Sequence, residues 1–259
     1  MQKKAPHQIG AELLQLVLYI KLWYNLLNEL RKEKTMNYLV VVAHPDDEVL
    51  GAGATIRKLV DEGEKIAVCI MSSKVSARSN ISASLEDEEQ KVMSMLGVQK
   101  VFRANFPNIK MNTVPHLELV KFVENCIEEW QADAIITHHI ADTNNDHSIT
   151  SEVVQVASRL FQRKPGIVPL KLLLFMEVLS STEWSLAPSA ERFAPNYFVE
   201  IGKKGIDVKL NALKTYNGVI REYPHPRSYE AIEALACYRG AQSGCRYAEA
   251  FECAFWAKR

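Results

Sequence analysis

Three acidic residues and a histidine stand together in the stretch His44-Pro45-Asp46-Asp47-Glu48, which directly follows a run of apolar residues. Unpaired charges beside a protein core are costly, and a bound cation would offset that cost. Pro45 suits the first position of a helical turn, in which residues three apart share one face. We therefore expect His44 and Asp47 to converge as metal ligands. Asp46 would then be a carboxylate that does not bind the metal, which a hydrolytic site also needs.

A second polar cluster runs from Asp142 to His147 and also follows an apolar run. His147 would supply a third ligand, and two imidazoles with one carboxylate leave an open position for water on Zn²⁺. Asp146 is then placed to orient a ligand imidazole or a substrate hydroxyl. Each cluster taken alone is also typical of a capped helix start. Two such clusters, each placed after a predicted strand, favour the metal site.

Strand-like and helical segments alternate from residue 36 onward, as in proteins with a parallel sheet covered by helices on both faces. Ligands of such sheets bind at the carboxyl ends of the strands, where both polar clusters lie. The predicted strands cover residues 38–43, 65–71, 101–106, 134–138, 170–176 and 197–201. The predicted helices cover residues 50–62, 85–96, 117–130 and 147–163, with a mainly helical tail over 228–259. The fold class is α/β, with a Rossmann-like, mostly parallel sheet.

The motifs AHPDDE, followed by LGAGATIRKL, and DTNNDH resemble the LmbE-like (PIG-L) superfamily of zinc-dependent N-acetylglucosaminyl deacetylases. The resemblance spans residues 37–253, and the tail elements PHPRSYEAIEALACYRGAQSG and RYAEAF resemble a bacterial subgroup. It implies a Rossmann-like fold and a site whose residues we carry over position by position. The implied metal ligands are His44, Asp47 and His147, the implied general base is Asp46, and Asp146 is a supporting carboxylate.

Two positions depart from the usual pattern of that family. Asn144 stands where members often have a histidine that stabilises the oxyanion, although an amide can still donate a hydrogen bond there. Leu85 stands where members often have an arginine. Four residues are candidates for these roles in substrate binding: His139 or His225 would replace the missing histidine, and Arg78 or Arg227 would replace the missing arginine.

These features predict a metal-dependent hydrolase that removes an acetyl group from a GlcNAc-like N-acetylated sugar, either a small molecule or a glycan. Water activated by Zn²⁺, or by Fe²⁺, would attack the acetamide carbonyl while Asp46 accepts the proton. Two alternatives stay open. One is an amidase that acts on a non-sugar acyl amide with the same machinery. The other is a metal-binding family member without turnover, which Asn144 and Leu85 make conceivable.

Charge and cysteine content indicate the binding partners and the cell compartment to expect. The formal net charge is zero, with 31 basic and 31 acidic residues, which gives no reason to expect a nucleic-acid partner. Five scattered cysteines without a C-x-x-C pair argue against a disulfide framework or a thiolate metal site and favour a cytoplasmic protein.

Residues 1–35 are expected to form an N-terminal helical extension, and residues 36–259 the deacetylase domain. Residues 11–31 are apolar but interrupted by Lys21, Asn25 and Asn28, so their unbroken apolar core is too short to span a bilayer. The alternatives for this segment are packing on the domain or on a partner subunit of a homo-oligomer, and contact with a membrane surface. A translation start at Met36 would remove it altogether.

Overall fold

The computed structural model describes residues 35–73, 84–186 and 192–258, together with Tyr19 and Lys21. The chain divides into two compact units, Met1–Thr35 and Met36–Arg259. In the first unit only Tyr19 and Lys21 are described ahead of Thr35, both helical and exposed, so most of the expected N-terminal extension lies outside the described residues. Among the helices that can be described, none is both long enough and apolar enough to cross a membrane.

A seven-stranded sheet with the order β3-β2-β1-β4-β5-β7-β6 forms the centre of the second unit. Five neighbouring strands are parallel, namely β1 (Asn37–Val42), β2 (Lys65–Ile70), β3 (Lys100–Arg103), β4 (Ala134–His138) and β5 (Leu172–Met176). β7 (Ala248–Trp256) runs antiparallel to both β5 and β6 (Tyr197–Glu200). The predicted mostly parallel α/β sheet is confirmed. The strand order reverses between β1 and β4, the place where such sheets bind ligands.

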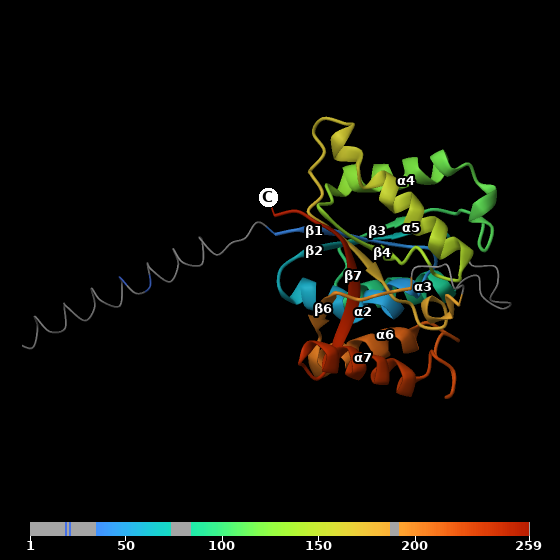
Figure 1. Cartoon of the computed structure of the whole chain (residues 1–259), viewed down its shortest axis with the longest axis vertical. Coiled ribbons are helices and arrows are strands. Elements are labelled where there is room, and N and C mark those ends of the chain that lie inside the picture. Colours follow the sequence, from blue (N-terminus) through green and yellow to red (C-terminus); the bar gives the residue numbers. More distant parts are fainter. Residues whose placement is uncertain (1–18, 20, 22–34, 74–83, 187–191, 259) are drawn as a thin grey trace, which may run out of the picture. The chain divides into compact units, whose positions relative to one another are not determined.

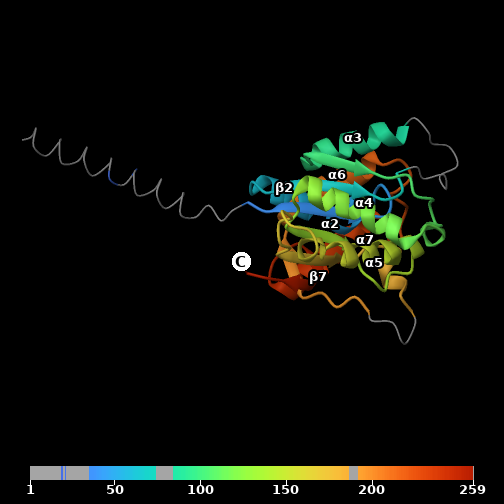
Figure 2. The same cartoon turned by 90° about the horizontal axis from the view of Figure 1, so that it is seen from above.

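Helices cover both faces of this sheet (Figures 1 and 2). On one face lie α2 (Asp47–Asp61), α3 (Ser84–Leu96) and α7 (Tyr229–Ser243), and α6 (Gly202–Thr215) packs against α2 and α3 on the same side. The other face packs against α4 (His116–Trp130) and α5 (Asn145–Ala157). Because successive strand residues point to opposite faces, each strand contributes to two separate cores. That double burial explains the unbroken apolar runs in the sequence.

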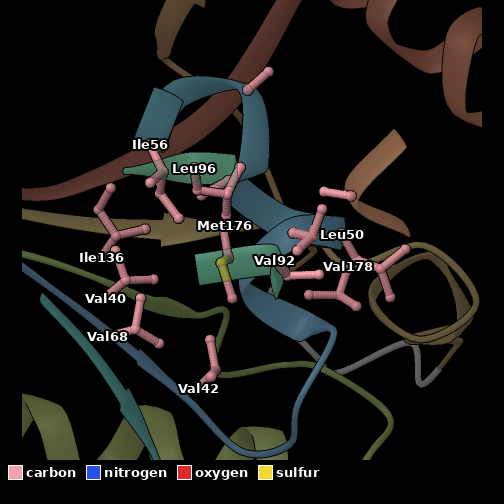
Figure 3. Close-up of a cluster of buried hydrophobic side chains, with 14 of the residues drawn as sticks. Val40, Val42, Leu50, Ile56, Val68, Val92, Leu96, Ile136, Met176 and Val178 are labelled. Carbon is pink, nitrogen blue, oxygen red and sulfur yellow. The ribbon is translucent and has the colours of Figure 1, made fainter. Parts of the chain in front are cut away.

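The core beneath α2 and α3 is built from side chains that lie opposite one another in register. Val40 of β1 pairs with Val68 of β2 and with Ile136 of β4, and all three are fully buried (Figure 3). Met176 of β5 reaches the same core. A Cβ atom built on Gly51 of α2 would lie 2.3 Å from the Met176 Sδ atom, so any larger residue at this position would have to displace the Met176 side chain.

The C-terminal tail differs from the prediction. We expected residues 228–259 to be mainly helical, but α7 ends at Ser243 and Ala248–Trp256 form β7, the longest of the strands described. Alanine and glutamate in this stretch favour a helix locally, and pairing with β5 and β6 overrides that preference. Helix α6, which we did not predict, packs against α2 and α3.

Other boundaries moved by a few residues. The helix predicted over 147–163 ends at Ala157 and is followed by a short 3-10 turn, η2 (Leu160–Gln162). The strand predicted over 101–106 is only four residues long. Helix α2 begins at Asp47, three residues before the predicted start, because its first turn contains the acidic residues of the first motif. All five cysteines are free thiols.

Candidate active site

The site lies where β1 and β4 end side by side. The loop after β1 carries His44, and the loop after β4 leads into α5, whose first turn carries His147. The backbone amide of Ala43 donates a hydrogen bond of 2.9 Å to Nε2 of His138, the last residue of β4. The His138 ring also stacks on that of His147, with centroids 3.9 Å apart and planes 18° from parallel. His138 therefore ties the two loops together.

The three predicted metal ligands lie close together. Oδ2 of Asp47 lies 3.3 Å from Nδ1 of His44 and 3.2 Å from Nε2 of His147. All three residues are buried, and one potential ligand atom from each lies within 4.8 Å of the others. Oδ2 of Asp47 also accepts the His44 backbone amide at 3.0 Å, which closes the turn between them. The geometry matches the i, i+3 relationship expected from the sequence.

A carboxylate holds the far nitrogen of each imidazole. Nε2 of His44 lies 3.1 Å from Oδ2 of Asp146, and that carboxylate also accepts the backbone amides of Ile109 and Met111. Nδ1 of His147 lies 3.2 Å from Oδ2 of Asp142. Such carboxylates fix the orientation and tautomer of metal-binding imidazoles.

Asp142 is itself held in place from the segment that follows β5. It accepts hydrogen bonds from the hydroxyls of Ser181 and Thr182, the latter at 2.8 Å. We did not single out Asp142 as a site residue. A search for a second carboxylate near His147 in the same loop would have found it, whereas no local signal points to Ser181 or Thr182.

The buried charges strongly shift the titration of the imidazoles. Burial alone would lower the pKa of His147, but Asp47 and Asp142 outweigh it and raise that pKa to about 10. Burial also opposes protonation of His44, yet Asp146 and Asp47 raise its pKa to about 9. His138, which no carboxylate contacts as closely, has its pKa lowered to about 3 by burial and by His147. Without a cation, protonation of His44 and His147 offsets part of the negative charge of the buried carboxylates around them.

The donor set fits a divalent cation in place of those protons. His44, Asp47 and His147 offer two imidazole nitrogens and one carboxylate oxygen, a combination typical of hydrolytic zinc sites. His138, Asp142 and His147 form a second group with similar spacing. In that group, Nε2 of His138 already accepts the Ala43 amide and Asp142 already accepts two hydroxyls, so the first group is the better candidate.

Asp46 stands between these ligands in an unusual backbone conformation. Its φ of 99° lies in the left-handed region, which residues other than glycine rarely adopt. Its side chain is buried, it makes no capping hydrogen bond to α2, and its Oδ2 lies 3.5 Å from Nη1 of Arg227. Nε of Arg227 also donates to the Ser180 hydroxyl at 2.7 Å. Arg227, a predicted substrate-binding residue, is therefore placed beside the predicted base.

Asn144, the predicted oxyanion donor, is the N-cap of α5. Its Oδ1 accepts a hydrogen bond of 3.0 Å from the Asp146 backbone amide. This bond fixes the orientation of the Asn144 side chain. The nitrogen of the amide is the atom that would donate to a substrate.

The other predicted substrate-binding residues lie in different surroundings. His139 is buried between the rings of Phe175 and Phe193, and its Nε2 lies 3.4 Å from Oε2 of Glu252 in β7. His225 is exposed, and its Nδ1 accepts the Arg227 backbone amide at 3.0 Å. Arg78 lies outside the described residues.

Comparison with known proteins shows which proteins these features resemble. Residues 39–158, which include both motifs, match the PIG-L family model, described as GlcNAc-PI de-N-acetylase. An uncharacterized deacetylase, YaiS of Escherichia coli K12, is 27% identical over 192 residues, which cover 71% of this chain and 91% of YaiS. The diacetylchitobiose deacetylase of Thermococcus kodakarensis is 23% identical over 231 residues, covering 82% of this chain and 80% of the relative.

The fold agrees with these matches. The crystal structure of the conserved protein TT1542 from Thermus thermophilus superposes with a TM-score of 0.71 at 23% identity, covering 87% of this chain and 97% of that one. The motifs and the sheet order agree with the family match, and over residues 39–158 the chain is similar to members of the PIG-L family.

Proposed function

We propose that this protein is a metal-dependent hydrolase that releases acetate from an N-acetylated sugar. One observation carries the proposal: His44, Asp47 and His147 converge where β1 and β4 end, with Asp46 beside them in the chain. The names of the two curated relatives support deacetylation, and that of the Thermococcus enzyme supports a sugar related to GlcNAc. A non-sugar acyl amide is the alternative substrate.

His44, Asp47 and His147 would hold the cation. When bound, a divalent cation acts as a Lewis acid on the acetamide carbonyl and lowers the pKa of water. Zn²⁺ is the proposed ion, because the nitrogen and oxygen donors suit it, and Fe²⁺ is the alternative. Asp142 and Asp146 keep the two imidazoles oriented towards Asp47, so the ligands need little rearrangement.

Asp46 would move the proton. Its carboxylate accepts a proton from the water that attacks the acetyl carbon, and it returns that proton to the sugar nitrogen as the carbon–nitrogen bond breaks. The products are acetate and the free amino sugar. Arg227 holds the Asp46 carboxylate in place, and the Asn144 amide is the proposed donor to the oxyanion.

The test is acetate release from a panel of N-acetylated sugars and non-sugar acyl amides, with metal analysis on the same sample. We expect turnover on a sugar substrate and a large loss of kcat in Asp46→Asn with metal content unchanged. Asp87→Asn, at an exposed acid of α3, is the control and should retain activity. Turnover only on non-sugar amides would favour the amidase, and no turnover by fully metallated protein would favour the non-catalytic alternative.

A further inference from the structure

The backbone of Asp46 has a left-handed conformation, and its amide contacts a side chain two residues away. The Asp46 amide donates a hydrogen bond of 3.0 Å to Oε2 of Glu48. Residues with a side chain rarely adopt a φ near 99°, so the surrounding structure must impose it. Such strain tends to occur where a functional group has to point in one direction.

Glu48 is in turn fixed from a distant part of the chain. Its other oxygen, Oε1, accepts the Tyr216 hydroxyl at 2.8 Å. Tyr216 follows the last residue of α6, and this helix packs along α2. Glu48 is 0% exposed and Tyr216 is 1% exposed, so the contact is shielded from water. In such surroundings a hydrogen bond to a carboxyl group is strong and directional.

We propose that Tyr216 and Glu48 are positioning residues for Asp46. Tyr216 orients the Glu48 carboxyl group, Glu48 holds the Asp46 amide, and the resulting turn directs the Asp46 carboxylate to the reacting water. The inference rests on the proposed function, because it assumes that Asp46 is the base. A buried glutamate needs hydrogen-bond donors wherever it lies. The specific feature here is that one of its donors is the amide of the strained residue itself.

The test variant is Tyr216→Phe, which keeps the buried ring and removes only the hydroxyl. The chain offers a matched control in Tyr247, which is also buried and donates a 2.8 Å hydrogen bond to Glu233 away from the site. Tyr216→Phe should lower kcat by about tenfold through misplacement of the base. Its KM should stay within about twofold, because substrate contacts are unchanged, and its metal content should equal that of the wild type. Tyr247→Phe should change none of these quantities.

Conservative replacement of Glu48 gives a second readout. Glu48→Gln keeps one acceptor oxygen for the Asp46 amide and should retain more turnover than Glu48→Ala at equal metal content. Equal losses in both Glu48 variants, an unchanged kcat in Tyr216→Phe, or an equal loss in Tyr247→Phe would each overturn the proposal while leaving the deacetylase function standing.

A measurement without substrate separates the two hypotheses. The ¹H and ¹⁵N resonances of the Asp46 amide report directly on its hydrogen bond to Glu48. They should shift in Tyr216→Phe and stay in place in Tyr247→Phe. If the wild type releases no acetate from any substrate, the proposed function fails. In that case, unchanged Asp46 amide resonances in Tyr216→Phe would still overturn the proposal that Tyr216 and Glu48 position Asp46.

Discussion

Nε2 of His147 lies 3.2 Å from Oδ2 of Asp47, although one residue lies in the first turn of α5 and the other opens α2. The contact exists because β1 and β4 are neighbours in the sheet and both helices start at the same edge. Nδ1 of the same ring faces Asp142 at 3.2 Å. His147 thus lies between two carboxylates, one shared with the proposed cation and one that orients the ring. Loss of the imidazole and loss of the orienting carboxylate should therefore have different effects on metal binding.

Loss of His147 should empty the metal site. His147→Ala removes one of three converging donors, so purified protein should contain far less zinc or iron by elemental analysis. His116→Ala, at the exposed start of α4, is the control and should retain full metal content. An unchanged metal content in His147→Ala would reject this residue as a ligand.

Asp142→Asn should weaken metal binding without removing a ligand. The variant can no longer offer His147 a carboxylate at Nδ1, so the tautomer and orientation of the ring are less well fixed. Partners of this kind are worth about 10–100-fold in metal affinity, measurable by competition with a chromogenic chelator. Asp207→Asn removes an exposed acid of α6 and should leave the affinity unchanged. Equal affinities in both variants would show that Asp142 has no such role.

The metal-free protein should lose stability at alkaline pH. The pKa values of His44 and His147, about 9 and 10, exceed their ordinary value of 6.5. Their protonation therefore stabilises the folded state fully below pH 6.5, and this contribution disappears as the pH rises through 9 and 10. The same protons compete with the cation, so metal affinity should increase over that range.

Urea unfolding of chelator-treated protein at about pH 6 and about pH 10.5 measures this effect. The wild type should lose on the order of a few kcal/mol more than His147→Gln between the two pH values. The variant corrects for the alkaline titration of other groups. The same pH dependence in both proteins would contradict the raised pKa of His147.

Lys209→Met should destabilise the fold. The Lys209 ammonium is buried and lies 2.6 Å from Oε1 of Glu249, a carboxylate that also accepts the backbone amides of Ala54 and Thr55 in α2. Removal of one partner leaves a buried charge uncompensated, which costs about 3–5 kcal/mol. Lys204→Met, which removes an exposed ion pair with Asp61, should change the free energy of unfolding much less. Chemical denaturation measures the free energy of unfolding of both variants. Equal losses of stability would show that the buried Lys209–Glu249 pair contributes no more than the exposed pair.

Much of the fold and the first motif could be predicted because both have local signals. The strand ahead of His44 is apolar on both faces, and the i, i+3 spacing brings Asp47 to His44. The strand β7 could not be predicted, because its residues favour a helix and only pairing with β5 and β6 makes them a strand. Tyr216 and Ser181 were missed for a related reason. Their contacts to Glu48 and Asp142 join segments that are distant in the sequence.

The most direct test of the roles of the metal and of Asp46 measures acetate release from an N-acetylated sugar in three preparations of the protein. They are the metal-loaded wild type, the chelator-treated wild type and metal-loaded Asp46→Asn. We expect acetate from the first alone, with activity restored to the second when Zn²⁺ or Fe²⁺ is added back. Turnover that survives complete removal of metal, or that is normal in Asp46→Asn, would contradict it.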